Sequence, residues 1–236
     1  MTTRNRGKQS NDDKLFAAKW QPIFTNAADD LGYLLSREYG VNASLQIVGN
    51  RYRLNKRQRS ALSRIGCGDH QFRQRKAKEV DTQKLENETV EIDGFNILIL
   101  LESLLSGAYV FLGRDGLYRD ISSVHGSYKR VTKTDDAIII IGKALEALHI
   151  NSAKWYFDQP VSNSGRLKTK LYEINEAHGF NWDVELVFDP DKVLAKSNQI
   201  VISSDGWILD QAQRWFNLGA HIIHTQFNDL DNIVKV

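Results

Sequence analysis

Between residues 88 and 206, short apolar runs that stop at an aspartate recur four times, and helix-like segments separate them. Runs of this length, rich in β-branched and aromatic residues, are typical of buried strands. Their alternation with helices predicts βαβ units, and so an α/β fold whose mostly parallel sheet is covered on both faces. The runs and their aspartates are Thr89–Ile92 with Asp93, Ala153–Phe157 with Asp158, Trp182–Phe188 with Asp189 and Asp191, and Gln199–Ile202 with Asp205.

The carboxyl ends of parallel strands meet at one edge of a sheet, where open α/β proteins bind their ligands. Four carboxylates gathered there would repel one another unless a cation lay between them. Oxygen ligands without cysteines or paired histidines favour Mg²⁺ or Mn²⁺, which suit phosphodiester hydrolysis. We therefore predict a catalytic site of Asp93, Asp158, Asp191 and Asp205, in which Asp93, Asp158 and Asp205 are the metal ligands.

Each aspartate also has an ordinary structural explanation, because aspartates cap helices and start turns. Asp189, which precedes Pro190, fits a turn, and Asp205 fits the N-cap of the helix behind it. For any one aspartate the two explanations are about equally good. The recurrence at four strand ends favours a shared site.

Polar side chains near these strand ends suit phosphate binding. An asparagine amide can donate to a phosphate or accept from a metal-bound water, and a helix N-terminus offers free backbone amides to an anion. The candidate phosphate ligands are Asn96, Arg119, Ser162, Asn163, Ser164, Lys192 and Ser204.

The polar segment 114–128 is predicted to be irregular and to lie beside the site. Asp120 is a further candidate catalytic residue, and Asp120 or His125 could assist proton transfer or metal binding. The alternative is an ordinary polar loop. We also predict a strand over Ala108–Gly113, a helix over Gly206–Phe216 and a final edge strand over Ala220–His224.

The N-terminal third predicts a small all-helical domain. Apolar residues recur at three- and four-residue steps over Lys14–Tyr39, and Asn55 can cap a helix that runs to Ile65. We expect a disordered leader over residues 1–12, a basic helical domain over 13–78, a linker over 79–87 and the α/β domain over 88–236. The five tryptophans lie at apolar-pattern positions, so we expect them in the core.

Charge is divided unevenly between the two domains. Residues 1–78 hold 16 Lys and Arg against 6 Asp and Glu, which is +10, and the rest hold 15 against 23, which is −8. Ten basic residues lie between residues 51 and 78, with Tyr52 and Phe72 among them, a mixture that suits phosphate contact and base stacking. A solvated helix face is the alternative. The candidate nucleic-acid contacts are Arg51, Arg53, Arg57 and Arg59.

Cys67 is the only cysteine, which excludes an internal disulfide and a cysteine-rich zinc cluster. No apolar run is long enough to span a bilayer, and the first 13 residues lack the apolar core of a secretory signal. We therefore expect a cytoplasmic protein without a membrane partner.

Two stretches resemble the NYN branch of the PIN-like nucleases. Ile92–Asn96 (Ile-Asp-Gly-Phe-Asn) resembles the Asp-Gly-Tyr-Asn opening of that branch, and Val201–Asp205 resembles its late Thr-Ser-Asp strand end. Asp158 and Asp191 fall in order between them. Over residues 88–225 the resemblance implies a Rossmann-like three-layer sandwich with an acidic Mg²⁺ or Mn²⁺ site that cleaves RNA or single-stranded nucleic acid. The acid expected in the first helix region has Glu102 or Asp120 as its candidates.

The whole chain also resembles an uncharacterised prokaryotic family that joins a helical domain (domain of unknown function 434) to such a C-terminal domain. Val48–Leu54 and Lys56–Arg59 give this likeness, with support from His125–Tyr128 and Pro160–Arg166. That family implies no activity.

Three functions fit the sequence. The first is a metal-dependent nuclease, with RNA as the expected partner, in which the basic domain holds the backbone. The second is a nucleic-acid-binding protein without catalysis, and the third is a Mg²⁺-dependent enzyme that acts on a small phosphorylated ligand. Salt-sensitive binding that ignores EDTA would favour the second.

Overall fold

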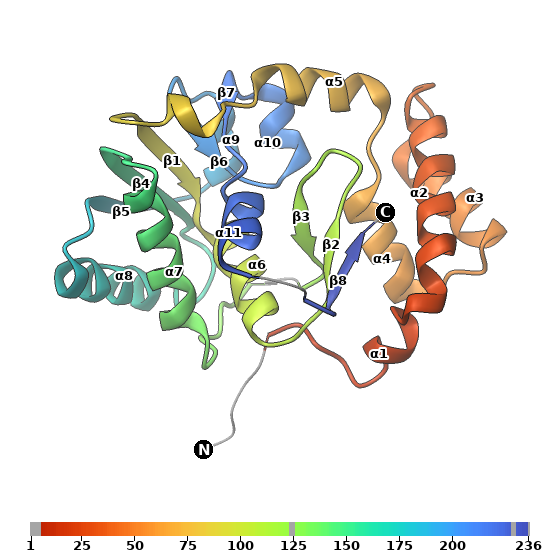
Figure 1. Ribbon diagram of the computed structural model, residues 1–236, viewed down its shortest axis with the longest axis horizontal. Helices are drawn as coiled ribbons and strands as arrows, with labels where there is room; N and C mark the ends of the chain where they lie inside the picture. The colour runs from red at the N-terminus through yellow and green to blue at the C-terminus, as the bar shows by residue number, and fades with distance from the viewer. Residues whose placement is uncertain (1–5, 123–125, 228–229, 236) are drawn as a thin grey trace.

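A parallel sheet in the order β5-β4-β1-β6-β7 forms the centre of the computed structural model, which describes residues 6–122, 126–227 and 230–235 (Figure 1). Every neighbouring pair in this sheet is parallel, which confirms the predicted α/β class. The strands are β1 (Thr89–Asp93), β4 (Ser152–Asp158), β5 (Trp182–Val187), β6 (Ile200–Ile202) and β7 (Arg214–Trp215).

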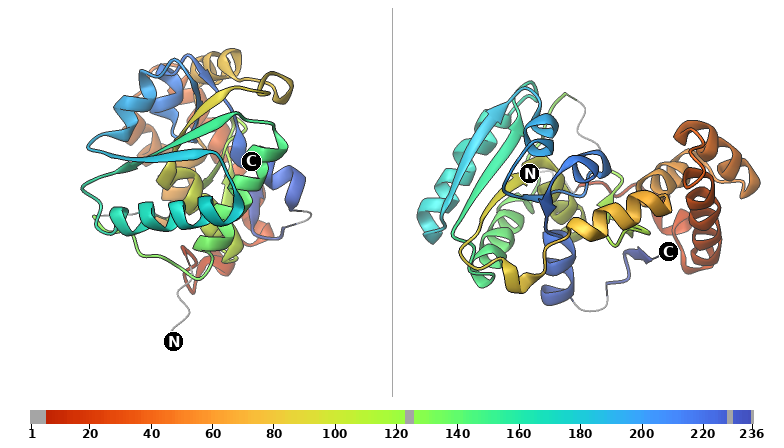
Figure 2. Two further views of the ribbon diagram at one scale, coloured as in Figure 1. Left: turned by 90° about the vertical axis from the view of Figure 1, so that its left-hand side faces the viewer. Right: turned by 90° about the horizontal axis from the view of Figure 1, so that it is seen from above.

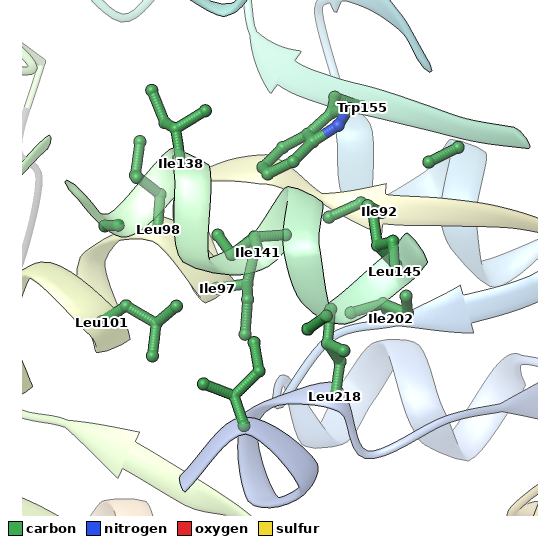
Figure 3. Packing of buried hydrophobic residues seen from close by; sticks show 14 of the residues in the cluster. Ile92, Ile97, Leu98, Leu101, Ile138, Ile141, Leu145, Trp155, Ile202 and Leu218 are labelled. Atoms are coloured by element: carbon green, nitrogen blue, oxygen red, sulfur yellow. The ribbon is translucent and has the colours of Figure 1, made fainter. Parts of the chain in front are cut away.

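Alternating side chains bury both faces of this sheet. Ile92, Trp155 and Ile202 point to one face, where they pack against helices in the main hydrophobic cluster (Figure 3). Tyr156 and Val201 point to the other face and a smaller cluster. This three-layer packing follows from the period of two along each strand. The first face is covered by α6 (Gly94–Leu105), α7 (Thr134–Ala147), α8 (Ser164–His178) and α11 (Leu218–Gln226), and the second by α9 (Pro190–Ala195) and α10 (Gly206–Gln211).

The N-terminal residues form the predicted helical domain at the right of Figure 1. Phe24, Leu31 and Leu62 lie in its core. Asn55 caps α4, as the sequence predicts. Gln58 completes a capping box with it. The elements are α1 (Asp12–Leu15), η1 (Ala18–Trp20), α2 (Gln21–Leu35), α3 (Val41–Arg51), α4 (Lys56–Ile65) and α5 (Asp69–Lys78), with η2 (Thr82–Lys84) in the linker.

A second, smaller sheet in the order β3-β2-β8 joins the two domains. Its strands are β2 (Val110–Leu112), β3 (Tyr118–Asp120) and β8 (Ile233–Lys235), and it lies beside α4 of the helical domain in Figure 1; the right view of Figure 2 shows the C-terminal strand next to the N-terminal helices. Phe111 and Val234 are buried in the helical cluster with Phe24. The helical domain therefore completes its core with one strand from the middle of the chain and one from its C-terminal end. Part of the segment expected to be irregular is β3.

Three local predictions are wrong. Ala220–His224 lies in α11 rather than in an edge strand, because Asn217 caps a helix there and buries Ile222 and Ile223 together. The helix predicted over Gly206–Phe216 ends at Gln211, and β7 follows it. Residues 6–12 make defined contacts instead of a disordered leader, while residues 1–5 lie outside the described residues.

Among the residues that the structure describes, no helix is long and apolar enough to cross a membrane.

Candidate functional site

The strand order places Asp93 at the switch point of the sheet, where the direction in which successive strands are added reverses. From β1 the chain adds β4 and β5 on one side, and then crosses to add β6 and β7 on the other. Ligands of open α/β sheets bind outside the carboxyl ends of the strands at such a switch point. Asp93 ends β1, and the turn 203–205 ends β6 beside it.

Hydrogen bonds join these two strand ends directly. Ser203 Oγ donates to Asp93 Oδ2 over 2.8 Å, and Asp205 N donates to Ser203 Oγ over 3.0 Å. Gly94 lets the start of α6 pack closely against β4, because a Cβ there would lie 2.4 Å from the Phe157 ring. The two predicted aspartates therefore lie in one rigid arrangement.

Asp93 and Asp205 are also helix caps, as their ordinary explanation requires. Asp93 Oδ1 accepts from Asn96 N at the start of α6 (3.4 Å), and Asp205 Oδ1 accepts from Trp207 N at the start of α10 (2.8 Å). Capping uses one oxygen of Asp205, and its Oδ2 has no hydrogen-bond partner among the described residues. The structural and functional explanations are thus compatible.

The surroundings of Asp93 disfavour its ionised form. Burial is the largest cause that raises its pKa to about 7; the charges of Asp191 and Asp205 act in the same direction, and the hydrogen bond from Ser203 opposes them. Burial and the charge of Asp205 likewise raise the pKa of Asp191. A bound cation would relieve the mutual repulsion between these carboxylates.

Asp158 belongs to a neighbouring group. Burial and then the charge of Asp189 raise the pKa of Asp158, and its Oδ1 is buried without a hydrogen-bond partner. The charge of Asp158 also acts on Asp191. Asp191 therefore links Asp158 to the pair formed by Asp93 and Asp205.

The expected metal set is not assembled as predicted. Among the described residues, no three Asp, Glu, His or Cys side chains come close enough together to hold one ion. The charges that act on Asp93 are those of Asp191 and Asp205. The structure therefore groups Asp191, rather than Asp158, with Asp93 and Asp205. The reason is that α9 turns back over the end of β1, where it packs against α10.

These aspartates line a cleft of about 770 Å³ between the two domains. One wall comes from the strand ends and the helix starts that follow them. The other comes from α2, α4, α5 and the loop 66–68 of the helical domain. Asp120 also lines it, and burial raises the pKa of Asp120 against the opposing charge of Arg64. His125 lies outside the described residues.

Three predicted phosphate ligands reach the cleft but already have protein partners. Ser204 donates from both N and Oγ to Asn96 Oδ1, each over 2.9 Å. Buried Arg119 forms two hydrogen bonds with Asp115 and donates from Nε to Ser204 O (2.7 Å). These contacts make Arg119 part of the framework that holds Ser204. They already occupy the guanidinium that was predicted to bind a phosphate.

The start of α8 does not reach the cleft. Asn163 donates to Tyr128 O over 2.8 Å, and Ser164 Oγ donates to Gln159 O. None of Ser162, Asn163 and Ser164 is among the cleft residues, although the neighbouring Val161 is. Exposed Lys192 is also absent from the lining and pairs with Asp189 over 2.8 Å. The predicted anion site is therefore separate from the aspartates.

The four basic residues chosen from the sequence lie away from the cleft as well. Arg57 binds Asp12 and the Gly7 carbonyl, and Arg59 binds the Leu54 carbonyl, so both stabilise the helical domain. Arg51 pairs at the surface with Asp30, and Arg53 is exposed. Sequence position alone could not separate these arginines from Arg64, which does line the cleft.

Arg64 is exposed at the C-terminal end of α4, and no hydrogen bond or ion pair is found for it among the described residues. Glu102, the candidate first-helix acid, lies outside the cleft lining. It is fully buried and binds Arg6, Tyr128 and Thr134. These contacts give Glu102 a structural role.

Two exposed aromatic residues at the cleft were missed. Phe188 is 77% exposed after β5, and Trp207 is 51% exposed two residues after Asp205. Trp207 was expected in the core because it precedes Ile208 in an apolar pattern. An aromatic residue directly beside a strand-end aspartate is the signal that could have identified both.

The comparisons with known proteins agree with the two domains. The family model described as domain of unknown function (DUF5616) matches residues 82–221, and that described as protein of unknown function (DUF434) matches residues 23–78. An uncharacterized protein, MJ0935, of Methanocaldococcus jannaschii is 34% identical over 183 residues, which are 78% of this chain and 87% of that protein. No solved structure gives a significant match. The chain therefore belongs to the DUF5616 family and has the DUF434 domain in front, as the sequence resemblance to a two-domain family predicted.

Proposed function

We propose that the protein is a metal-dependent nuclease that acts on RNA in the cleft between its two domains. The observation that supports this most is the electrostatic coupling of Asp93 with Asp191 and Asp205 at the switch point of a parallel sheet. The likeness of Ile92–Asn96 to the NYN branch of the PIN-like nucleases supports the same reaction.

The chemistry of the donor set fits Mg²⁺ or Mn²⁺. Because no three carboxylates among the described residues come within reach of one ion, Asp93 and Asp205, which are joined through Ser203, would hold it, and waters would complete its shell. Mg²⁺ commonly keeps several waters and binds through one or two carboxylates and a substrate phosphate, so this open arrangement suits it. When bound, the ion would polarise the phosphoryl group and acidify an attacking water.

Groups on both walls of the cleft suit a nucleic-acid strand. Arg64 presents a guanidinium without a described partner, and guanidinium groups match phosphate oxygens in shape and charge. Phe188 and Trp207 offer exposed rings on which bases can stack. Ser203 and Asn96 hold Asp93 in place, so its position is set before a substrate enters.

The deciding experiment compares cleavage of end-labelled mixed-sequence RNA by the full chain and by Asp93→Asn and Asp205→Asn in Mn²⁺. At Asp205 asparagine keeps the one oxygen that caps the helix, and at Asp93 it keeps one of the two acceptor oxygens, so the fold is largely preserved while the charge is lost. We expect roughly 100-fold slower cleavage, since the metal contributes several kcal/mol and 1.36 kcal/mol is a factor of ten.

Asp183→Asn is the matched control, because Asp183 is an exposed strand aspartate that accepts a hydrogen bond from Tyr172 and does not line the cleft. It should cleave at the parent rate. If Asp93→Asn cleaves as fast as the parent, the site is misassigned. Salt-sensitive RNA binding without cleavage would instead support a non-catalytic binder.

A further inference from the structure

Arg75 is a buried arginine of the helical domain that extends into the α/β domain. It is 8% exposed near the end of α5. Its Nε and Nη2 donate to both carboxylate oxygens of Asp210 (2.7 and 3.0 Å), and its Nη1 donates to Asp115 Oδ2 (2.6 Å). Its carbonyl accepts from Trp215 Nε1 over 2.8 Å. The guanidinium is therefore fixed at the junction of the two domains.

Asp115 connects this guanidinium to the edge of the cleft. Its two oxygens also accept from Arg119 Nη1 and Nη2 (2.8 and 2.7 Å), and Arg119 Nε donates to Ser204 O over 2.7 Å. Two guanidinium groups face two carboxylates in this cluster, so its charges balance, as buried charges require. A continuous chain of ion pairs thus ends on the backbone of the turn after β6.

That turn positions the aspartates. Ser204 is tied to Asn96, whose own backbone amide donates to Asp93. Ser203 in the same turn donates to Asp93 and accepts from Asp205 N. A shift of the Ser204 carbonyl would therefore move both aspartates of the switch point.

Arg75 also touches the turn itself. A Cβ added at Gly206 would lie 2.6 Å from Arg75 Nη2, so the guanidinium packs against the backbone between Asp205 and Trp207. Glycine is needed at this position because a side chain would displace the guanidinium.

We propose that Arg75 is a positioning residue through which the DUF434 domain holds the Asp93–Asp205 site in its working geometry. The helical domain then has a task beyond contact with substrate: it completes the framework of the site. The effect on catalysis rests on the proposed nuclease function, while the effect on the turn does not.

An arginine suits this task because its planar fork binds one carboxylate with two bonds while a further N–H reaches a second one. Lysine offers a single flexible ammonium group and cannot hold Asp210 and Asp115 in the same geometry. The conservative variant Arg75→Lys should therefore keep the positive charge but hold the turn after β6 less firmly than arginine does.

The test is hydrogen exchange of the full chain with Arg75 replaced by methionine or by lysine. In Arg75→Met the amides of residues 204–208 should exchange about tenfold faster or more, while those of β1 and β4 stay protected. Arg75→Lys should give a smaller increase at the same amides. Asp210→Asn, which weakens the clamp at its more exposed end, should act in the same direction and covers the case in which Arg75→Met fails to fold.

Arg6→Met is the matched control. Arg6 forms a comparable ion pair with fully buried Glu102 (2.7 Å), and neither residue lines the cleft. This variant should lose general stability without faster exchange at residues 204–208. Unchanged exchange at residues 204–208 in both Arg75→Met and Asp210→Asn, or an equal increase in Arg6→Met, would overturn the proposal.

Kinetics then separate positioning from binding. In Arg75→Met, kcat on RNA should fall about tenfold or more, with KM within about twofold of the parent, because small displacements of reacting groups lower the rate more than the affinity. A rise in KM with kcat unchanged would make Arg75 a binding residue and refute the positioning role. Should the parent cleave no RNA, the nuclease function fails and the exchange results still decide the structural part.

Discussion

Replacing Asp93 with asparagine should stabilise the metal-free protein, and the gain should grow as the pH rises. Burial, with the charges of Asp191 and Asp205, raises the pKa of Asp93 from 3.8 to about 7 in the folded protein. Between these values the folded protein keeps a proton that the unfolded chain has released. Stability from this group is therefore highest below pH 4, falls as the pH rises to about 7, and is constant above that.

The size of the effect follows from the same values. A rise of the pKa from 3.8 to about 7 corresponds to a penalty of roughly 4 kcal/mol once the group is ionised, at 1.36 kcal/mol for each tenfold change. Of this, roughly 2–3 kcal/mol develops between pH 5 and pH 8. Asparagine has no charge to bury, and its amide oxygen can still accept from Ser203, so Asp93→Asn escapes the penalty.

The assay is urea unfolding in EDTA at pH 5 and pH 8, followed by tryptophan fluorescence and by circular dichroism. The stability difference between Asp93→Asn and the parent should be larger at pH 8 than at pH 5. Asp183→Asn is the control, because a hydrogen bond from Tyr172 holds the pKa of Asp183 below its usual value, and Asp183 lies outside the cleft. A stability difference between Asp93→Asn and the parent that is the same at both pH values would refute the argument that burial disfavours the ionised form of Asp93.

Three further predictions test other parts of the molecule. Trp207→Ala should weaken single-stranded RNA binding in EDTA by about 1–3 kcal/mol, measured by fluorescence anisotropy, with little loss for duplex RNA. Asn55→Ala should lower the free energy of unfolding by about 1 kcal/mol, read from urea melts, because it removes the capping box of α4. Native Cys67 should resist alkylation at pH 8 and react once urea is added, since burial raises the pKa of its thiol to about 11.

The sequence predicted well those features that depend on neighbours along the chain. Strand–helix alternation gave the parallel sheet, and the position of Asp93 at a strand end placed it at the ligand-binding edge. The N-cap at Asn55 was predicted because it needs only residues two and three positions further on. Local signals failed at Ala220–His224, where an apolar run of this length fits a strand or a helix equally well.

Side-chain partners could not be predicted in the same way. Arg57, Arg59 and Arg119 look like free cations in the sequence, but each has buried or backbone partners. Some of these partners are far away in the chain, since Arg57 binds Asp12 45 residues away and Arg119 binds Ser204 85 residues away. The same holds for Trp207, whose exposure depends on the cleft rather than on its neighbours.

The sequence by itself determined the α/β class, the helical domain before it and the presence of aspartates at the ends of parallel strands, because these follow from periodicity and capping. Only the tertiary structure decided which aspartates share a site, since α9 brings Asp191 to Asp93 and Asp205. It also decided that Arg75 and Asp115 connect the helical domain to that site. Both outcomes depend on contacts between segments far apart in the chain, whose geometry is set by how the layers pack.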